Sequence, residues 1–259
     1  MTQFTREKSE DGVTERLFDL TVDGERVPAA IWAPEGASGP RPLMLMGHGG
    51  SQHKKIGTLA ARARQYALRL GYATLAIDAP GHGDRISREQ AETNAHEVGA
   101  RVRGERGQNP TFSPDMLKTM AERTKRAVPE WKAALDAAQA LPFVGAHDRI
   151  GYWGVSMGTA IGVPFVAGEP RIKCAVFGLA GMREGMTAMA DAAAAIAIPL
   201  EFVFQWEDAV ASREAGLALF NAFSSKEKTM HINPGGHVEI PNFEGASWER
   251  FFVRHLGKA

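Results

Sequence analysis

The sequence of 259 residues contains only one cysteine, Cys174, so no disulfide can form within the chain. Its first residues, MTQFTREKSE, lack the apolar segment of a secretory signal. Both features are typical of a reducing compartment, and we expect a cytoplasmic location. Cys174 lies in the apolar run RIKCAVFGLA, where a lone cysteine is far more often a small core residue than a nucleophile.

The sequence has no excess of charge of either sign. Lys plus Arg and Asp plus Glu number 30 each, so the chain has no overall field that would attract nucleic acid or an anionic membrane. No apolar run reaches the roughly 18 residues of a membrane-spanning helix. The histidines and carboxylates also lack the spacing of a local metal site, and we expect neither a metal nor a cofactor. These absences favour a small neutral or mixed-charge substrate.

Predicted strands alternate with predicted helices along most of the chain. Two alternating runs, residues 15–20 and 27–33, flank Asp23-Gly24, which is a strong hairpin signal. Further strands are expected at residues 43–47, 73–78, 149–153, 172–179, 199–206 and 228–233, with helical segments between them. This order predicts an α/β fold with a mainly parallel eight-stranded sheet, an antiparallel N-terminal hairpin and helices on both faces.

The length of the chain favours a single domain over residues 1–259. Residues 83–114 are polar, only weakly periodic and long for a connection within a compact domain. Together with a helical stretch at residues 114–126 they predict a partial cap or lid, residues 83–126, and a separate helix is expected around residues 129–140. We expect the pocket to be shaped by this segment and by the loop after Leu179, with apolar candidates for substrate contact at Phe112, Met116, Met182 and Met186.

A serine lies at the centre of the most informative motif. Residues Gly154 to Gly158, GVSMG, fit G-x-S-x-G between a predicted strand and a predicted helix, which is the context that a nucleophile elbow requires. Such a turn strains the backbone of Ser156 and leaves its hydroxyl above the edge of the sheet. A small serine in an ordinary turn would not need both glycines.

A serine hydroxyl needs a base that is itself held by a third group. His237 lies in a loop after the last predicted strand and is the expected base, whereas His231 lies inside that strand. The acid should follow the preceding strand, where Asp208 is preferred and Glu207 is the close competitor. For an oxyanion, the loop HGGS offers the N–H of Gly50, or alternatively Ser51, and the residue after the serine, Met157, offers a second.

These motifs resemble the α/β-hydrolase fold family over nearly the whole chain. The likeness consists of HGGS, DAPGHGD, GVSMG, Asp208 and NPGGH in the family's order, and it is strongest to dienelactone-hydrolase-like and acyl-peptidase-like serine esterases. It implies a triad of Ser156, Asp208 and His237, with Gly50 and Met157 as the oxyanion hole. The chain departs from many relatives before the acid, where it has Phe204-Gln205-Trp206 and they carry a His-Gly pair. The nucleophile of dienelactone hydrolases proper is a cysteine.

The sequence therefore predicts a serine carboxylic ester hydrolase that acts on small molecules through an acyl-enzyme on Ser156. A peptidase, amidase or thioesterase would use the same triad, and a non-hydrolytic enzyme or a binding protein would share the fold. The substrate and the oligomeric state, including a possible homo-oligomer, do not follow from these residues.

Overall fold

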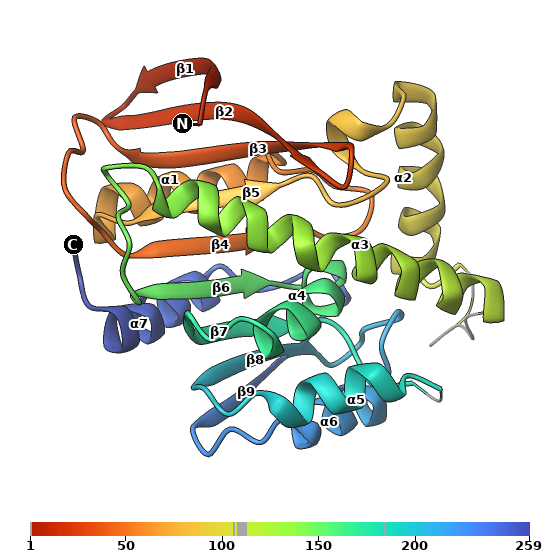
Figure 1. The fold of residues 1–259 in the computed structure, drawn as a ribbon. Helices are drawn as coiled ribbons and strands as arrows, with labels where there is room; N and C mark the ends of the chain where they lie inside the picture. Colours follow the sequence, from red (N-terminus) through yellow and green to blue (C-terminus); the bar gives the residue numbers. More distant parts are fainter. Residues whose placement is uncertain (1, 106, 108–112, 184) are drawn as a thin grey trace.

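The computed structural model describes residues 2–105, 107, 113–183 and 185–259, so Phe112 lies outside the described part of the chain. The described residues form a nine-stranded sheet in the order β1-β2-β3-β5-β4-β6-β7-β8-β9 (Figure 1). The strands are β1 (Phe4–Glu10), β2 (Val13–Val22), β3 (Glu25–Pro34), β4 (Leu43–Gly47), β5 (Ala73–Ile77), β6 (Ile150–Gly154), β7 (Ile172–Gly178), β8 (Leu200–Gln205) and β9 (Lys228–Asn233).

The sheet has two parts. Strands β1, β2 and β3 are antiparallel to one another, and β3 pairs antiparallel with β5, whereas all pairs from β5 to β9 are parallel. The predicted α/β class, antiparallel start and parallel remainder are confirmed. The additional strand is β1, whose residues are nearly all exposed. It pairs with β2 alone and has no apolar face, so hydrophobic alternation gave no signal for it.

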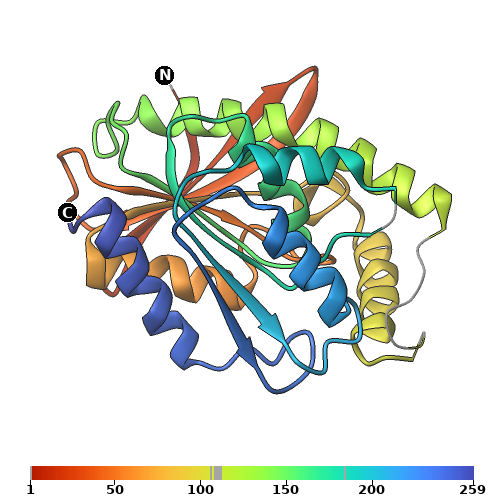
Figure 2. The same cartoon turned by 90° about the horizontal axis from the view of Figure 1, so that it is seen from below.

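Helices cover both faces of the sheet (Figure 2). Apolar residues of α1 and α7 pack on one face, and those of α3, α4, α5 and α6 pack on the other. Among the described residues, no helix is both long and apolar enough to cross a membrane. The helices are α1 (Gly57–Leu70), the short 3₁₀ turn η1 (Gly83–Arg85), α2 (Arg88–Val102), α3 (Pro114–Gln139), α4 (Met157–Ala167), α5 (Thr187–Ala195), α6 (Arg213–Ala222) and α7 (Phe243–Leu256).

Helix α3 differs from the prediction. Residues 114–126 and a helix beginning near Pro129 were expected as separate pieces, but one helix of 26 residues contains Pro129 in its interior. The proline removes one backbone hydrogen bond without ending the helix, because the following residues Trp131, Ala134 and Leu135 are held in the core. The N-terminal turns of α3 continue past the sheet toward α2 (Figures 1 and 2).

A buried ion pair joins α3 to the turn after β5. Arg85 Nη1 and Nη2 donate to the two carboxylate oxygens of Glu130 at 2.7 and 2.9 Å, and both side chains are buried. Arg85 also donates to the main-chain carbonyl of Asp78 at 3.2 Å. This bidentate ion pair satisfies both charges and fixes the direction of α3 relative to the sheet.

Replacing Glu130 by alanine should strongly destabilise the protein, because it leaves the buried Arg85 guanidinium with only the exposed carboxylate of Glu25, 3.9 Å away. We expect the free energy of unfolding, measured by urea denaturation, to fall by about 3–5 kcal/mol. The matched control is Glu92→Ala, which removes the exposed partner of Arg88 on α2 and should cost less than about 1 kcal/mol. Equal losses in the two variants would contradict the role given to the buried pair.

Candidate active site

Ser156 lies at the turn between β6 and α4. Its backbone has φ 58° and ψ −119°, a conformation that residues other than glycine seldom adopt and that stores strain. Its N–H donates to the carbonyl of Gly178 at 2.9 Å, and the N–H of Gly178 in turn donates to the hydroxyl of Thr159 at 2.8 Å. Neighbouring strands therefore hold the strained turn in place.

The two glycines of the motif are required by close backbone contacts. A Cβ on Gly158 would lie 2.6 Å from the carbonyl oxygen of Gly47 at the end of β4. A Cβ on Gly154 would lie 2.9 Å from the backbone of Gly158. The first turn of α4 thus packs directly against the ends of two parallel strands, which aims the Ser156 side chain away from the sheet.

The structure brings Ser156, His237 and Asp208 together in a hydrogen-bonded chain. His237 Nε2 lies 2.9 Å from Ser156 Oγ, and His237 Nδ1 lies 2.8 Å from Asp208 Oδ2. Because a carboxylate only accepts, Nδ1 carries the proton and Nε2 is left to accept from the serine hydroxyl. The other oxygen of Asp208 accepts from the N–H groups of Val210 and Ala211 at 2.7 and 3.1 Å, which fixes the carboxylate.

Glu207 and His231, the alternatives named from the sequence, form hydrogen bonds with other groups. The exposed Glu207 carboxylate accepts from the N–H of Gly235, and the N–H of Glu207 donates to the Gly235 carbonyl at 3.0 Å. His231 pairs with the buried carboxylate of Glu244, its Nδ1 lying 2.8 Å from Oε2. The geometry therefore favours Asp208 and His237 over Glu207 and His231.

Gln205 explains the departure from the family pattern before the acid. Its buried amide donates to the carbonyls of Pro234 and Glu239 at 3.2 and 2.8 Å. These two carbonyls lie on either side of His237 in the chain. Gln205 therefore holds the histidine loop, residues 234–239, against the end of β8. No local sequence pattern indicates this role, since the partners are about 30 residues away along the chain.

The residues expected as oxyanion donors lie in the loop after β4 and at the start of α4. Gly50, Ser51 and Met157 line the same cavity as Ser156 and His237. Within the described part of the chain, no hydrogen bond uses the N–H groups of Gly50, Ser51 or Met157. All three are therefore candidates to donate to a ligand, and Ser51 has a positive φ of 57° that turns the loop sharply.

His48 holds this loop from within. Its Nε2 accepts from the N–H of Ala79 at 3.0 Å, so Nδ1 carries the proton and donates to the Gly49 carbonyl at 2.8 Å. Burial lowers the pKa of His48 from 6.5 to about 4 and keeps the ring neutral. The ring of His82 packs against it with 5.4 Å between the centroids, and burial lowers the pKa of His82 also.

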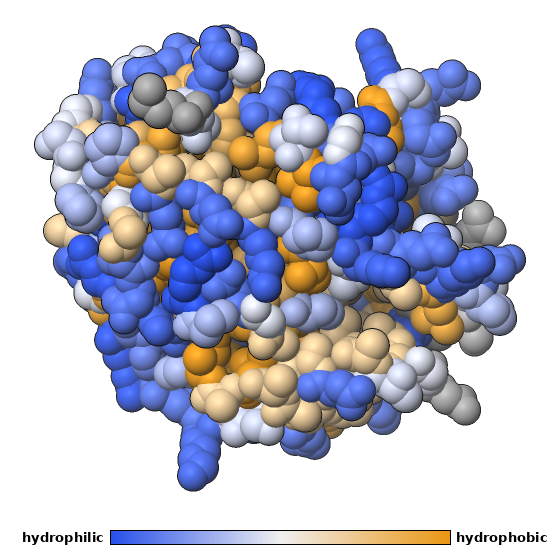
Figure 3. All heavy atoms as spheres, in the orientation of Figure 1, coloured by the Kyte–Doolittle hydropathy of each residue, from blue (hydrophilic) through white to orange (hydrophobic). Residues whose placement is uncertain are grey.

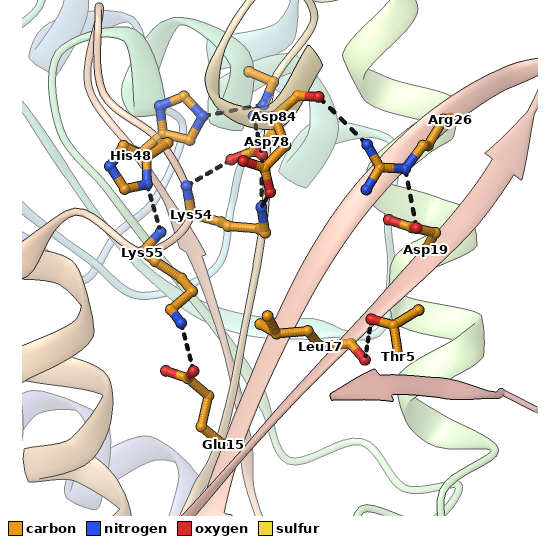
Figure 4. Close-up of polar contacts among 12 residues, drawn as sticks. Thr5, Glu15, Leu17, Asp19, Arg26, His48, Lys54, Lys55, Asp78 and Asp84 are labelled. Atoms are coloured by element: carbon orange, nitrogen blue, oxygen red, sulfur yellow. Dashed lines mark hydrogen bonds and ion pairs between the residues drawn. The ribbon is translucent and has the colours of Figure 1, made fainter. Parts of the chain in front are cut away.

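Lys54 fixes the far end of the same loop (Figure 4). Its ammonium group lies 2.7 Å from Asp78 Oδ2 and 2.6 Å from Asp84 Oδ2, and its backbone N–H donates to Asp78 Oδ1 at 2.8 Å. Asp78 is completely buried, whereas the Asp84 side chain is exposed. The hydrogen bond from Lys54 lowers the pKa of Asp84. Gly50 is thus carried on a loop attached at both ends to the segment after β5.

The cavity above Ser156 has a volume of about 960 Å³. Its walls come from α2, α3, α4 and the segment before α5, and they include the predicted contact residues Met116 and Met186. Met182 does not line the cavity, although it packs against the core as Met186 does. Figure 3 shows hydrophobic residues exposed over α5, below the more hydrophilic surface over α3. Among the described residues, no group of three His, Cys, Asp or Glu side chains is arranged to hold a metal ion.

The neutral state of His48 predicts a pH dependence of stability. Between pH 6.5 and about 4, the unfolded chain binds a proton at His48 that the native protein does not, so acidification favours unfolding. The contribution is fully present above pH 6.5 and amounts to at most about 3 kcal/mol. The His48→Gln variant lacks it. The difference in unfolding free energy between the wild type and this variant should therefore shrink from about pH 7 to about pH 4.5, and a difference independent of pH would contradict the assignment.

Comparison with known proteins gives a consistent picture. No protein-family model and none of the curated proteins matches the sequence. Among solved structures, a cold-adapted esterase from an Arctic intertidal metagenomic library is 33% identical over 98% of this chain and 100% of its own, with a TM-score of 0.77. An acetyl xylan esterase from Paenibacillus sp. R4 is 17% identical over 99% of this chain and 88% of its own, with a TM-score of 0.74. Est1E from Butyrivibrio proteoclasticus is 18% identical over 93% of this chain and 100% of its own, with a TM-score of 0.67. The last two likenesses concern the fold alone.

Proposed function

The chain belongs to the α/β-hydrolase family of serine esterases, and on that premise we propose that it hydrolyses carboxylic esters of small molecules through an acyl-enzyme on Ser156. The observation that carries this proposal is the hydrogen-bonded chain from Ser156 Oγ to His237 Nε2 and from His237 Nδ1 to Asp208. A hydroxyl, a neutral imidazole and a fixed carboxylate in this order form the arrangement that activates a serine.

In the first step, Ser156 Oγ attacks the ester carbonyl while His237 Nε2 takes the hydroxyl proton. The resulting imidazolium is stabilised by Asp208 and then gives its proton to the departing alcohol. In the second step, water attacks the acyl-enzyme, His237 again accepts the proton, and the acid leaves as the serine recovers its hydrogen. The proton of Ser156 leaves with the alcohol and is replaced by one from water, so the enzyme regains its starting protonation state and the two steps need no cofactor.

The negative charge on the carbonyl oxygen would be met by the N–H groups of Gly50 and Met157. Support comes from their place in the cavity beside Ser156 and from the absence of any other partner for these N–H groups within the described chain. Met157 is also the first residue of α4, where the helix dipole favours a negative charge. The anchors at His48 and Lys54 keep the Gly50 N–H in place before the substrate arrives, and such preorganisation lowers the barrier.

The remaining predictions from the sequence extend the proposal. We infer that residues 83–126 act as a partial cap, since α2 and the N-terminal half of α3 line the cavity. The buried free Cys174 fits a protein of a reducing compartment, and we infer a cytoplasmic location from it. The partner is a small-molecule ester, with no nucleic acid or membrane involved.

Ser156→Ala and His237→Ala should each lower kcat by up to about a millionfold on a para-nitrophenyl ester, since these residues act as a unit. The double variant should be scarcely slower than either single one. Losses that multiply in the double variant would argue against a shared mechanism. A fluorophosphonate probe should add its mass to the wild type on the peptide that contains Ser156, and the Ser156→Ala protein serves as the control.

Asp208→Asn should preserve the fold and slow turnover by about 10⁴-fold, because an amide cannot hold His237 in the required tautomer. The neighbouring substitution Glu207→Gln changes the same charge one residue away and should have little effect on kcat. Thermal unfolding of both variants would confirm that the fold is retained. If Glu207→Gln is the slow variant, the assignment of the acid is wrong.

A further inference from the structure

We propose that Arg123 binds a carboxylate of the substrate, so that the preferred substrates are esters that carry a second, ionised acid group. This inference rests on the proposed function and names the substrate class of the same site. It arises from a guanidinium group in the cavity that the proposed chemistry does not use.

Arg123 lies on the part of α3 that covers the cavity and lines it together with Ser156 and His82. Its Nη1 lies 3.8 Å from the sulfur of Met157, the residue that follows the serine in the chain. The guanidinium is therefore close to the nucleophile turn, on the side of the cavity formed by α3.

Arg123 lacks a counter-ion in the described part of the chain. Its one hydrogen-bond partner there is the thioether of Met157, which is a weak acceptor. Burial lowers the pKa of Arg123, and no described carboxylate acts against this shift. By contrast, Arg126 on the same helix lies 3.4 Å from the carboxylate of Glu25, and the buried Arg85 forms an ion pair with Glu130.

The surroundings strengthen an interaction with an anion. Val98, Met120, Val128 and Ile161 contribute apolar walls to the cavity. A partly desolvated guanidinium beside such walls loses favourable hydration, and a carboxylate that accepts two parallel N–H bonds restores it. An ester without such a group would leave the cation unpaired.

The other charges of the cavity do not provide the missing partner. The carboxylates of Glu97 and Asp115 belong to exposed residues on α2 and α3, and Lys125 is exposed as well. Arg183 donates to the main-chain carbonyl of Val210. Arg123 is thus a half-buried cation that lines the space where the substrate would lie.

The experiment compares pairs of esters that differ by one carboxylate. Monomethyl adipate and methyl hexanoate test the acyl side, and para-acetoxybenzoate and para-tolyl acetate test the alcohol side. For at least one pair, Arg123→Gln should lower the ratio of kcat/KM for the charged over the neutral ester by about 10- to 100-fold, because a charge-assisted hydrogen bond is lost. Arg123→Lys, which keeps the charge, should retain part of the preference.

Arg126→Gln is the matched control, since it removes the same charge from the same helix at a residue that does not line the cavity. It should leave the ratio unchanged. An equal loss on both esters of each pair in Arg123→Gln would show that Arg123 only supports Met157, and an unchanged ratio would show that it does not contact substrate. Either result overturns the proposal.

A binding measurement separates this inference from the proposed function. In the Ser156→Ala background, which prevents acyl transfer, calorimetry should show tighter binding of the charged ester of the affected pair, and Arg123→Gln should abolish the difference. Failure of the wild type to hydrolyse any ester would count against the proposed chemistry, whereas equal binding of charged and neutral esters would count against the role of Arg123.

Discussion

The site depends on one steric constraint, the close approach of the first turn of α4 to the ends of β4 and β6. With no side chain at Gly158, its backbone fits against the carbonyl of Gly47, and this contact sets where the helix begins. Ser156 must then adopt a positive φ to connect strand and helix. The strain is balanced by the hydrogen bond from its N–H to Gly178, so the geometry of the nucleophile is determined by the sheet rather than by a flexible loop.

Two further loops meet this fixed point, and each has its own anchors. The loop with Gly50 is attached to the segment after β5 through His48 and Lys54. The loop with His237 is attached to the end of β8 through Gln205. Because these anchors are buried side chains that hydrogen-bond to both segments they join, the loops can lie at the open edge of the sheet and still keep Gly50 and His237 at fixed positions. Each anchor joins segments that are distant in the sequence.

The separation of these segments along the chain decides which parts of the site could be predicted from the sequence and which could not. Ser156, Asp208 and His237 follow strands, and the rule that parallel strands end at one edge of the sheet suffices to bring them together. The nucleophile motif around Ser156 is a local pattern, so it can be recognised in the sequence alone. The contacts of Lys54 with Asp78 and of Gln205 with the histidine loop have no local pattern, since they form only when the sheet assembles. Strand β1 was missed because its polar residues lack an apolar face. The continuity of α3 was missed because Pro129 normally signals an end, yet packing of the following residues offsets one lost hydrogen bond.

The groups proposed for the reaction and the residues proposed to select the substrate lie on different parts of the fold. The groups proposed to break the ester bond are attached to the sheet, whose geometry is set by backbone pairing and glycine contacts. The wall that faces them belongs to α2 and the first half of α3, where few side chains are buried and the backbone continues past the sheet. Substitutions in α2 and the first half of α3 leave the core packing intact, so the residues there can vary with the substrate without a loss of stability. A half-buried cation that has no counter-ion among the described residues is costly in such a place unless a ligand compensates for it. We therefore assign the selection of the substrate to Arg123, whereas the residues at the edge of the sheet are assigned to the reaction.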